Sequence, residues 1–269
     1  MICFPNAKIN LGLNVVNKRK DGYHNLETVF YPLKIHDALE IVPNEALPED
    51  TLFQSGLQVE GSPSENLAIK ALRLMRQQYD FPTLEVHLLK KIPFGAGLGG
   101  GSADASFMLR LINDTFHLGA NDEELAKLAL QLGADCPFFI YNRPLFATGI
   151  GEVFEEVQVS LENYYFVLVK PDVHVSTKDA FGGISPQVPT LSLKEIIQLP
   201  VEEWKSVMVN DFEKTVFTKH PEIAKVKEEM YTSGAVYASM SGSGSSVYGI
   251  FDKKTAFEAD PLRHQVIPT

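Results

Sequence analysis

Cysteines and long apolar runs are scarce in this sequence. Its 269 residues include two cysteines, Cys3 and Cys136, which cannot form the set of bridges typical of small secreted domains. No apolar run approaches the ~20 residues that a membrane-spanning helix needs. The first apolar stretch has no basic region ahead of it and meets polar residues by Asn6, unlike a secretory signal. These absences predict a cytoplasmic protein with no membrane partner.

Basic residues are also few. Lysine and arginine number 24 against 34 aspartates and glutamates, which gives a formal net charge of -10 and an isoelectric point near 5.2. This balance is opposite to the basic surface of nucleic-acid binders, so we expect no nucleic acid as a partner. A small anionic ligand stays compatible with it, because backbone N–H groups and one lysine can hold a phosphate whatever the global charge. We expect small-molecule substrates, and no feature implies a protein partner.

The remaining composition is that of an ordinary globular protein, with 45% hydrophobic and 22% charged residues. The length fits one large domain or two of ordinary size. Turn signals at 142–144 and 149–151 are followed by the strand-like run YYFVLVKP at 164–171, which opens a second half. We therefore expect an N-terminal domain over 1–155 and a C-terminal domain over 156–269.

Hydrophobic periodicity predicts a mixture of strands and helices. Apolar and polar residues alternate over 7–16, which predicts a strand with one core face and one polar face. The Asp21-Gly22 turn signal predicts a hairpin that returns over 26–35. Asn121 reads as a helix N-cap, and Gly133 as the residue that closes that helix. Further helices are expected at 65–79, after the glycines at 95–101 through Phe116, and near 202–212 and 221–231, and further extended runs at 84–92, 138–159, 164–171 and on both sides of 242–245.

The strongest local signal is the segment KKIPFGAGLGGGSADAS at 90–106, in which a strand enters a loop with five glycines and then a helix. Glycines leave backbone N–H groups uncovered and permit positive φ, and the helix N-terminus behind them adds its dipole. This arrangement predicts a phosphate cradle rather than a merely flexible loop.

The identity of the phosphate ligand is a separate question. The spacing Gly95-x-Gly97-x-x-Gly100 satisfies the dinucleotide fingerprint, but that fold needs a second parallel strand after the helix. Here the helix through Phe116 is followed by another helix, which disfavours a dinucleotide site. The Walker A pattern needs a lysine at the end of the loop, and the sequence has Ser102 there instead.

Two further candidates are single charged residues. Lys8 shares the polar face of its strand with Asn6, Asn10 and Asn14, and the absence of an acidic residue on that face leaves its charge available for an anion. A lysine on a strand is more commonly just solvated. Asp135 follows the end of a helix, where an aspartate usually bonds local backbone in a turn. Spacing alone does not choose between these interpretations.

Three segments resemble, in order and spacing, the motifs of the GHMP small-molecule kinases. They are PNAKINLGLNV at 5–15, PFGAGLGGGSADAS at 93–106 and ASMSGSGSSVYGIF at 238–251. The DGYH turn at 21–24 and LGADCPFF at 132–139 are most similar to the branch of that family that phosphorylates a cytidyl-linked sugar alcohol in non-mevalonate isoprenoid precursor synthesis. The resemblance covers nearly the whole chain.

This resemblance implies an α+β fold in which a domain like the second domain of ribosomal protein S5 packs against a ferredoxin-like C-terminal domain, with the active site between them. It implies ATP as phosphoryl donor with Mg²⁺, for which Ser102 is the only suggested protein ligand, so we assign no metal-binding residue. Residues matched to the ATP loop are Pro93, Phe94, Gly95, Ala96, Gly97, Leu98, Gly99, Gly100, Gly101, Ser102 and Ala103.

Roles for the acceptor side follow from the same resemblance. Asp135 would be the base toward the acceptor hydroxyl, and Lys8 its charged partner near the γ-phosphate. Asn10 would help to position them. Tyr23 would stack on the cytosine and His24 would hydrogen-bond it, with Phe181 as a less closely matched second stacking face.

Such a set of residues suffices for phosphoryl transfer, which depends on positioning and on charges placed where negative charge develops. Other functions remain open. The chain could be a GHMP kinase for mevalonate or homoserine, a non-catalytic RNA-binding module on the S5-like fold, or a dinucleotide-dependent oxidoreductase. A panel of acceptor alcohols, the net charge and a test of NAD(P)H binding separate these alternatives.

Overall fold

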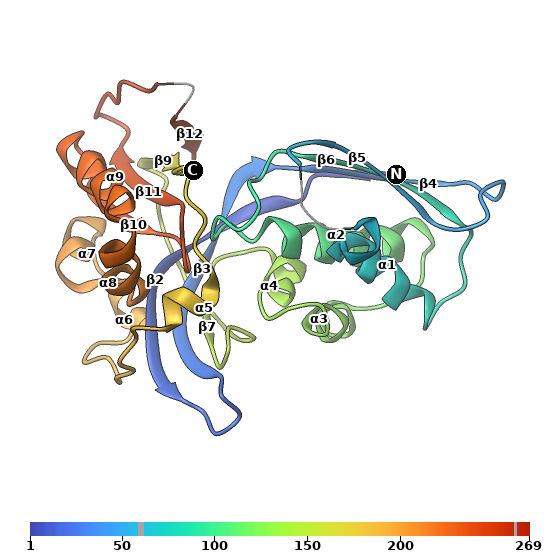
Figure 1. Ribbon diagram of the computed structural model, residues 1–269, viewed down its shortest axis with the longest axis horizontal. Coiled ribbons are helices and arrows are strands. Elements are labelled where there is room, and N and C mark those ends of the chain that lie inside the picture. Colours follow the sequence, from blue (N-terminus) through green and yellow to red (C-terminus); the bar gives the residue numbers. More distant parts are fainter. Residues whose placement is uncertain (59–61, 261–262) are drawn as a thin grey trace. The chain divides into compact units, whose positions relative to one another are not determined.

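The computed structural model describes residues 1–58, 62–260 and 263–269, and these residues form a mixed α+β structure (Figure 1). They contain three four-stranded sheets, and the chain divides into two compact units. Unit 1 comprises Met1–Ala7, Ile35–Phe94 and Gly99–Arg143, and unit 2 comprises Lys8–Lys34, Gly95–Leu98 and Pro144–Thr269. The expected α+β class is confirmed.

Unit 1 combines one sheet with a layer of helices. The sheet has the order β1-β4-β6-β5, and all its pairs are antiparallel except β5 with β6. The elements are β1 (Ile2–Cys3), β4 (Ala38–Pro43), β5 (Thr51–Gly56), η1 (Pro63–Glu65), α1 (Leu67–Arg76), β6 (Leu84–Lys90), α2 (Gly100–Thr115), α3 (Asp122–Leu130) and α4 (Cys136–Tyr141). Helices α1 and α2 lie against one face of the sheet (Figure 1).

The core of unit 1 follows from two periodicities. Alternate residues of β4 and β6, such as Leu39, Ile41 and Val86, point to the helices, as the two-residue period of a strand requires. Helix α2 packs against these residues with an apolar face that includes Met108 and Ile112, which are four residues apart. This packing fixes the direction in which α2 leaves the glycine loop.

Unit 2 is built around a second sheet of order β10-β11-β9-β12, in which every pair is antiparallel. Helices α7, α8 and α9 lie beside this sheet (Figure 1). The elements are β7 (Leu145–Thr148), β8 (Val153–Glu156), β9 (Tyr164–Val169), α5 (Thr177–Phe181), α6 (Leu193–Ile196), α7 (Val201–Val207), α8 (Phe212–Lys219), α9 (Pro221–Thr232), β10 (Tyr237–Met240), β11 (Val247–Asp252) and β12 (Gln265–Pro268).

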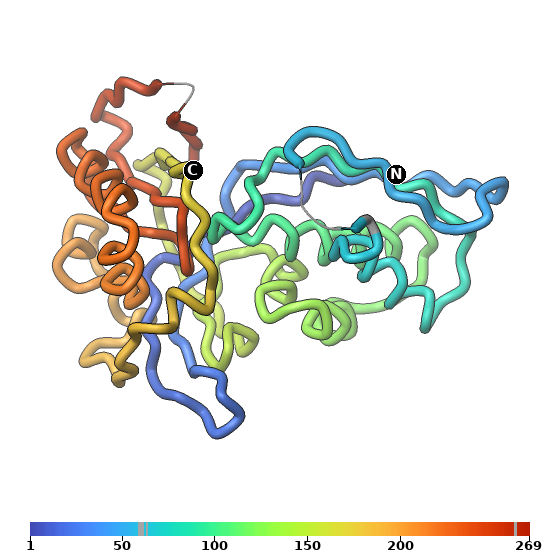
Figure 2. The backbone as a smooth tube through the Cα atoms, viewed as in Figure 1, coloured from blue at the N-terminus to red at the C-terminus, as the bar shows by residue number. Residues whose placement is uncertain are grey.

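The third sheet has the order β2-β3-β7-β8 and contains the two longest strands, β2 (Asn6–Lys18) and β3 (His24–His36). The predicted hairpin is confirmed: a tight connection joins β2 to β3 (Figure 2), and Gly22 adopts φ +91° in it. Leu13 and Val15 of β2 belong to the core of unit 2. Residues 8–15 of the N-terminal motif therefore belong to unit 2.

The polar face of β2 differs from the expectation. Lys8, Asn10 and Asn14 are buried along with the apolar residues between them, so both faces of the strand are covered from Asn6 to Val15. A polar face can be buried only where its groups find hydrogen-bond partners. Some of these partners, such as Ser241 and Tyr248 for Asn10, come from segments far away in sequence, which the alternation of residue types cannot reveal.

Helix predictions around the glycine loop are largely confirmed. Asn121 and Glu124 form a capping box at the start of α3, and residues 116–121 between α2 and α3 contain no strand, which agrees with the rejection of a dinucleotide fold. The expected extended run at 138–159 is wrong at its start, because α4 occupies 136–141. Pro137 near the start of α4 supplies a preset helical φ, a signal that the aromatic run concealed.

The two units are not the two halves of the chain. Residues 8–34 and 95–98, from the first half, belong to unit 2. The division into domains 1–155 and 156–269 therefore stays a prediction about sequence domains and does not describe these units. None of the helices in the described ranges is long and apolar enough to cross a membrane.

Candidate active site

The glycine loop joins β6 to α2, as predicted. Gly95, Gly97 and Gly99 have φ of +63°, +75° and +71°, and Gly99 is the N-cap of α2. L-residues rarely adopt this left-handed conformation, which explains the glycine at each of these positions. Glycine has no side chain that could cap the helix, so the first N–H groups of α2 stay available for an anion.

In unit 2, the loop residues Gly95–Leu98 pack against residues 241–246, the glycine-rich part of the third sequence motif and hereafter the third glycine-rich segment. A Cβ placed on Gly97 would come within 2.0 Å of the Ser241 carbonyl oxygen, so no other residue fits there. The Ser241 hydroxyl donates to the Gly97 carbonyl at 2.8 Å, and the Ser246 N–H donates to the Ala96 carbonyl at 3.2 Å. Two of the three sequence motifs are therefore in direct contact.

In unit 1, buried charges surround the base of α2. Lys90 at the end of β6 donates to Asp37 and, at 2.7 Å, to Asp104 in the second turn of α2. Burial raises the pKa of Asp104 to about 7, against the opposing effect of the Lys90 charge. Asp37 also accepts the backbone N–H of Ile92 at 2.9 Å. These contacts tie together the strand before the loop and the helix after it.

Lys8 does not have the solvated position of a typical strand lysine. It is 3% exposed, it donates from Nζ to Asn10 Oδ1 at 2.7 Å, and its ammonium lies 5.0 Å from the centre of the Phe30 ring. The alternative of a merely solvated lysine is therefore wrong, and the role of its charge toward an anion stays a prediction. Its backbone N–H donates to the Leu98 carbonyl at 2.9 Å, which connects β2 to the glycine loop.

Every polar group of Asn10 has a partner in unit 2. Its Oδ1 accepts from Lys8, its Nδ2 donates to Thr28 at 2.9 Å, and its backbone N–H donates to the Ser241 hydroxyl at 3.3 Å. Its carbonyl accepts from the Tyr248 hydroxyl at 2.8 Å. A residue held at four points has one orientation, so Asn10 can fix the direction of the Lys8 ammonium.

Asp135 lies in unit 1 as the N-cap residue of α4. Its side chain makes no hydrogen bond that caps this helix, and the residue is half-buried. This geometry argues against a capping role for the Asp135 side chain and does not test the interpretation as a turn residue. Its catalytic role stays a prediction.

The residues assigned to the cytidine group lie in unit 2. The ring of His24 stacks on Phe181, with centroids 4.7 Å apart and planes 20° apart, and Phe181 in turn meets Phe212 edge to face at 4.8 Å. Tyr23, in the hairpin turn, has a side chain that is 62% exposed. Burial and the nearby charge of Lys18 lower the pKa of His24 below its usual value. The loosely matched Phe181 thus lies beside the histidine that it was expected to accompany.

The described residues contain no group of three or more His, Cys, Asp or Glu side chains that could share a metal ion. The Ser102 hydroxyl, the one suggested ligand, hydrogen-bonds the Cys136 thiol, whose pKa is raised to about 11 mainly by burial.

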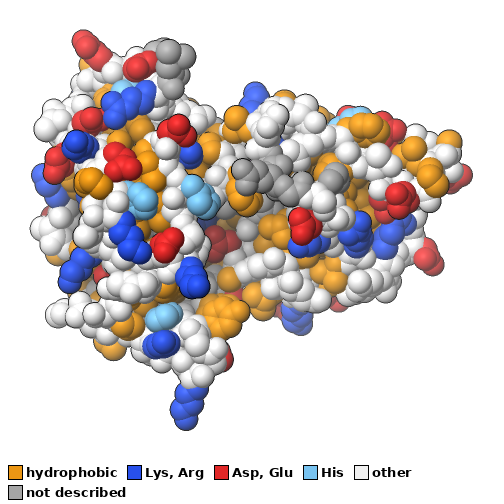
Figure 3. Space-filling model, viewed as in Figure 1, with side chains coloured by type: hydrophobic (Ala, Val, Ile, Leu, Met, Phe, Trp, Pro, Cys, Tyr) orange, Lys and Arg blue, Asp and Glu red, His pale blue; other side chains and the backbone are white. Residues whose placement is uncertain are grey.

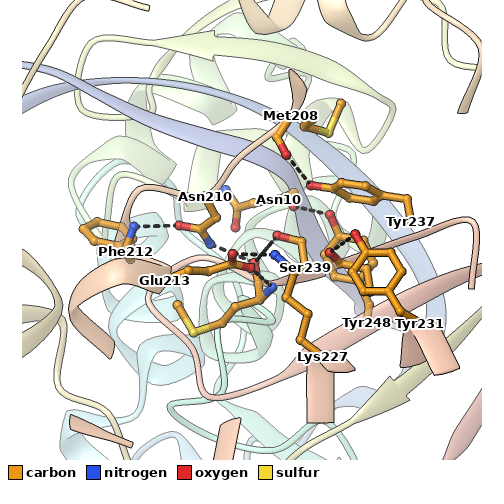
Figure 4. A network of polar contacts seen from close by, with 12 residues as sticks. Asn10, Met208, Asn210, Phe212, Glu213, Lys227, Tyr231, Tyr237, Ser239 and Tyr248 are labelled. Atoms are coloured by element: carbon orange, nitrogen blue, oxygen red, sulfur yellow. Dashed lines mark hydrogen bonds and ion pairs between the residues drawn. The ribbon is translucent and has the colours of Figure 1, made fainter. Parts of the chain in front are cut away.

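The predictions from sequence missed the segment 210–213. Asn210 and Glu213 are buried or nearly so and bond the strand β10 and the loop that follows it (Figure 4). The sequence pattern predicts that this segment is the end of a helix near 202–212, whereas the structure has Asn210 and Asp211 between α7 and α8 and begins α8 at Phe212.

Two family models match this chain. The model described as "GHMP kinases N terminal domain" matches residues 66–143, and the model described as "GHMP kinases C terminal" matches residues 192–260. The N-terminal match contains the glycine loop and Asp135, and the C-terminal match contains Asn210 and the third glycine-rich segment. Both sets of loop residues thus fall inside family-defining regions.

Relatives of high identity carry one name. A 4-diphosphocytidyl-2-C-methyl-D-erythritol kinase of Parabacteroides distasonis is 59% identical over 97% of this chain and 96% of its own. A protein of the same name from Bacteroides fragilis is 58% identical over 93% of this chain and 92% of its own. A crystal structure of 4-(cytidine 5'-diphospho)-2C-methyl-D-erythritol kinase has a TM-score of 0.81 at 29% identity and covers 99% of this chain and 98% of its own.

More distant structures share the fold. A homoserine kinase from Cytophaga hutchinsonii has a TM-score of 0.63 at 19% identity, covering 93% of this chain and 86% of its own. The mevalonate kinase of Methanococcus jannaschii has a TM-score of 0.67 at 14% identity, covering 95% and 92%. The chain therefore belongs to the GHMP kinase family of small-molecule kinases, in its 4-diphosphocytidyl-2-C-methyl-D-erythritol kinase branch.

Proposed function

We propose that this protein transfers the γ-phosphoryl group of ATP to the 2-hydroxyl of 4-(cytidine 5'-diphospho)-2-C-methyl-D-erythritol, a step of non-mevalonate isoprenoid precursor synthesis. The observation that carries the proposal is the 59% identity over nearly the whole chain to a kinase named for this acceptor. The geometry of the loop, the lysine and the aromatic pair supports it independently.

The glycine loop is proposed to hold the phosphates of ATP. Left-handed glycines and the uncapped N-terminus of α2 supply N–H groups without side chains in the way. This also accounts for a phosphate site in a chain of net charge -10, since the binding groups belong to the backbone.

Lys8 and Asp135 are proposed to act on the acceptor hydroxyl. Asp135 takes the proton from the hydroxyl as the oxygen attacks the γ-phosphorus, and Lys8 stabilises the negative charge that spreads over the transferred group. Little covalent chemistry is asked of the protein, because phosphoryl transfer depends mainly on position and charge. Asn10 supports this role through its bond to the Lys8 ammonium.

Tyr23, His24 and Phe181 are proposed to hold the cytosine. A neutral imidazole can donate one hydrogen bond and accept another, and the lowered pKa of His24 keeps the ring neutral at physiological pH. Phe181 keeps the His24 ring in one plane by stacking on it. Tyr23, exposed in the hairpin turn, offers its ring face for stacking.

Mg²⁺ is proposed as the ion that accompanies ATP and neutralises part of its phosphate charge. The N–H groups of the loop hold the phosphates that coordinate it, and no carboxylate cluster of this chain is assigned to it. We expect a cytoplasmic enzyme, which the two unpaired cysteines support, and small-molecule substrates without a protein partner.

The direct test is ATP consumption by the purified protein with and without the cytidyl acceptor, followed by identification of the phosphorylated product. The expected result is acceptor-dependent ADP release and a new phosphate monoester. Mevalonate and homoserine, tested in parallel, should support little ADP release. Transfer to either of them with no transfer to the cytidyl alcohol would overturn the proposal.

The second candidate function is phosphorylation of another acceptor alcohol, such as mevalonate or homoserine, by the same kind of kinase. The homoserine and mevalonate kinases share the fold at 14–19% identity, which says nothing about the acceptor of this chain. An RNA-binding function finds no support in the charges, because acidic and basic side chains are interspersed on the face that Figure 3 shows.

A further inference from the structure

Asn210 lies between α7 and α8, and its side chain is buried at 3% exposure. Its Nδ2 donates to the carbonyls of Met240 at 2.8 Å and Gly242 at 2.9 Å, and its Oδ1 accepts the N–H of Phe212 at 3.0 Å. All hydrogen-bonding directions of the amide except one acceptor site are thereby used. The residue is a bridge between two stretches of backbone rather than part of an apolar core.

The two carbonyls that Asn210 holds belong to the peptide group before Ser241 and to the peptide group after Gly242. Holding these two peptide groups restrains the backbone of Ser241 and Gly242 between them, and with it the position of the Ser241 hydroxyl. That hydroxyl accepts from the Asn10 backbone N–H and donates to the Gly97 carbonyl. Asn210 thus acts, through one intermediate residue, on the strand of Lys8 and on the glycine loop.

The same segment is anchored from both sides. Leu13 N–H donates to the Val209 carbonyl and Asp211 N–H donates to the Leu13 carbonyl, at 2.9 and 2.8 Å, so the segment runs beside β2. The side chain of Glu213 accepts from the Met240 N–H at 2.9 Å and pairs with Lys227 at 2.5 Å (Figure 4). These bonds hold the backbone of Asn210 in place, so the position of its side-chain amide is also restrained.

We propose that Asn210 is a positioning residue for phosphoryl transfer, which sets the Ser241 hydroxyl so that the glycine loop and the Lys8–Asn10 strand keep their mutual register. This inference rests on the proposed function and adds a residue to its machinery. A neutral amide suits the place, because a cation could not accept the Phe212 N–H and a carboxylate would face two carbonyl oxygens.

The test compares Asn210→Ala, Ser241→Ala and the double variant with Tyr165→Phe as control. Tyr165→Phe also removes one hydrogen bond from side chain to backbone in unit 2, the bond to Thr255, but touches neither glycine segment. We expect Asn210→Ala to lower kcat/KM for ATP about 10- to 100-fold, the cost of a small misplacement of reacting groups. KM for the cytidyl acceptor should change less than about threefold, and the control should match the wild type.

The double variant separates a relay from two independent defects. If Asn210 acts through Ser241, the double variant loses about as much as the worse single variant, and multiplied losses overturn the proposal. Should Asn210→Ala be too unstable to purify, Asn210→Ser replaces it, since the serine hydroxyl cannot reach both carbonyls.

Amide hydrogen exchange provides a readout that does not depend on turnover. In Asn210→Ala, exchange should rise at 95–98 and 241–246 and stay unchanged in β9 and α9. A uniform rise across unit 2 would indicate a purely structural role and overturn the proposal. If the wild type fails to phosphorylate the acceptor, the proposed function falls, while the exchange pattern still decides whether Asn210 sets the loop.

Discussion

At the residue scale, the proposed roles of Asp135 and Lys8 are tested by replacing each side chain. Asp135→Asn keeps the size and hydrogen-bonding capacity of the side chain but removes the base. General-base assistance contributes about 10²–10⁴-fold, so kcat should fall within that range while KM for either substrate changes only a few-fold. Steady-state kinetics check this, with Asp80→Asn on the surface of unit 1 as a control of near-normal activity.

Lys8→Met should also lower kcat, because a positive charge is lost where negative charge develops. If the two residues act as a unit, as proposed, the double variant should lose clearly less than the product of the single losses. Multiplied losses, or near-normal kcat in Asp135→Asn, would mean that Asp135 is an ordinary turn residue.

The aromatic residues of the hairpin and α5 provide the second prediction. Tyr23→Ala should raise KM for the cytidyl acceptor about 5- to 150-fold, the value of roughly 1–3 kcal/mol for one stacking face, with much less effect on KM for ATP. Phe181→Ala should act in the same direction by releasing the His24 ring. Phe53→Ala is the matched control, because Phe53 stacks on His87 in unit 1 at 5.2 Å and 16°. If both Michaelis constants rise together, these residues are structural.

His24 gives the acceptor site a pH dependence of defined sign. Burial and Lys18 hold its pKa below 6.5, so the ring is neutral above that pH and becomes protonated on acidification. KM for the acceptor should be flat from pH 7 to 8 and rise below pH 6.5, as the ring loses its acceptor nitrogen. His24→Asn should have a raised KM with little change over this range, whereas an unaltered pH profile in that variant would exclude the histidine.

At the element scale, the N-terminus of α2 is tested best at Gly101. A Cβ there meets only the end of Leu67 at 3.5 Å and no positive φ is required, whereas a Cβ at Gly100 would lie 2.8 Å from Ile92. Gly101→Val should therefore fold normally and weaken ATP binding at least several-fold, because the side chain covers the N–H groups offered to phosphate. Calorimetric titration with a non-hydrolysable ATP analogue measures this, with Gly182→Ala as control. Unchanged ATP affinity in the folded variant would contradict the proposal that the N-terminus of α2 binds the phosphates.

At the scale of the whole molecule, the buried Lys90–Asp37–Asp104 cluster links stability to pH. The pKa of Asp104 rises from 3.8 to about 7 on folding, so the folded chain binds more protons than the unfolded chain between these values. The contribution of Asp104 to the free energy of unfolding is therefore greatest below pH 4 and declines toward pH 7. Asp104→Asn should flatten this decline in urea unfolding between pH 4.5 and 7.5, and Asp80→Asn should not. An identical slope in wild type and Asp104→Asn would contradict the assignment.

Much of the fold and part of the site could be predicted from the sequence. The capping box at Asn121, the hairpin at Gly22 and the glycine loop are local signals, encoded within a few residues, and all three are confirmed. Family membership was predictable because three motifs with fixed spacing are more specific than any one of them.

The remaining features depend on residues distant in sequence. Burial of the polar face of β2 depends on Ser241 and Tyr248, more than 200 residues away from Asn10. The role of Asn210 in the loop is invisible for the same reason. The interleaved limits of the two units follow from tertiary contacts and have no compositional mark.

That interleaving has a consequence for synthesis on the ribosome. Unit 1 has all its residues once Arg143 has been made, but the segment Lys8–Lys34 must wait, because Leu13 and Val15 find their apolar partners as late as Phe251. The nascent chain therefore carries an exposed apolar strand through most of translation, a period in which chaperones or early misassembly act. The strand that bears Lys8 is among the first segments to emerge and among the last to reach its final neighbours.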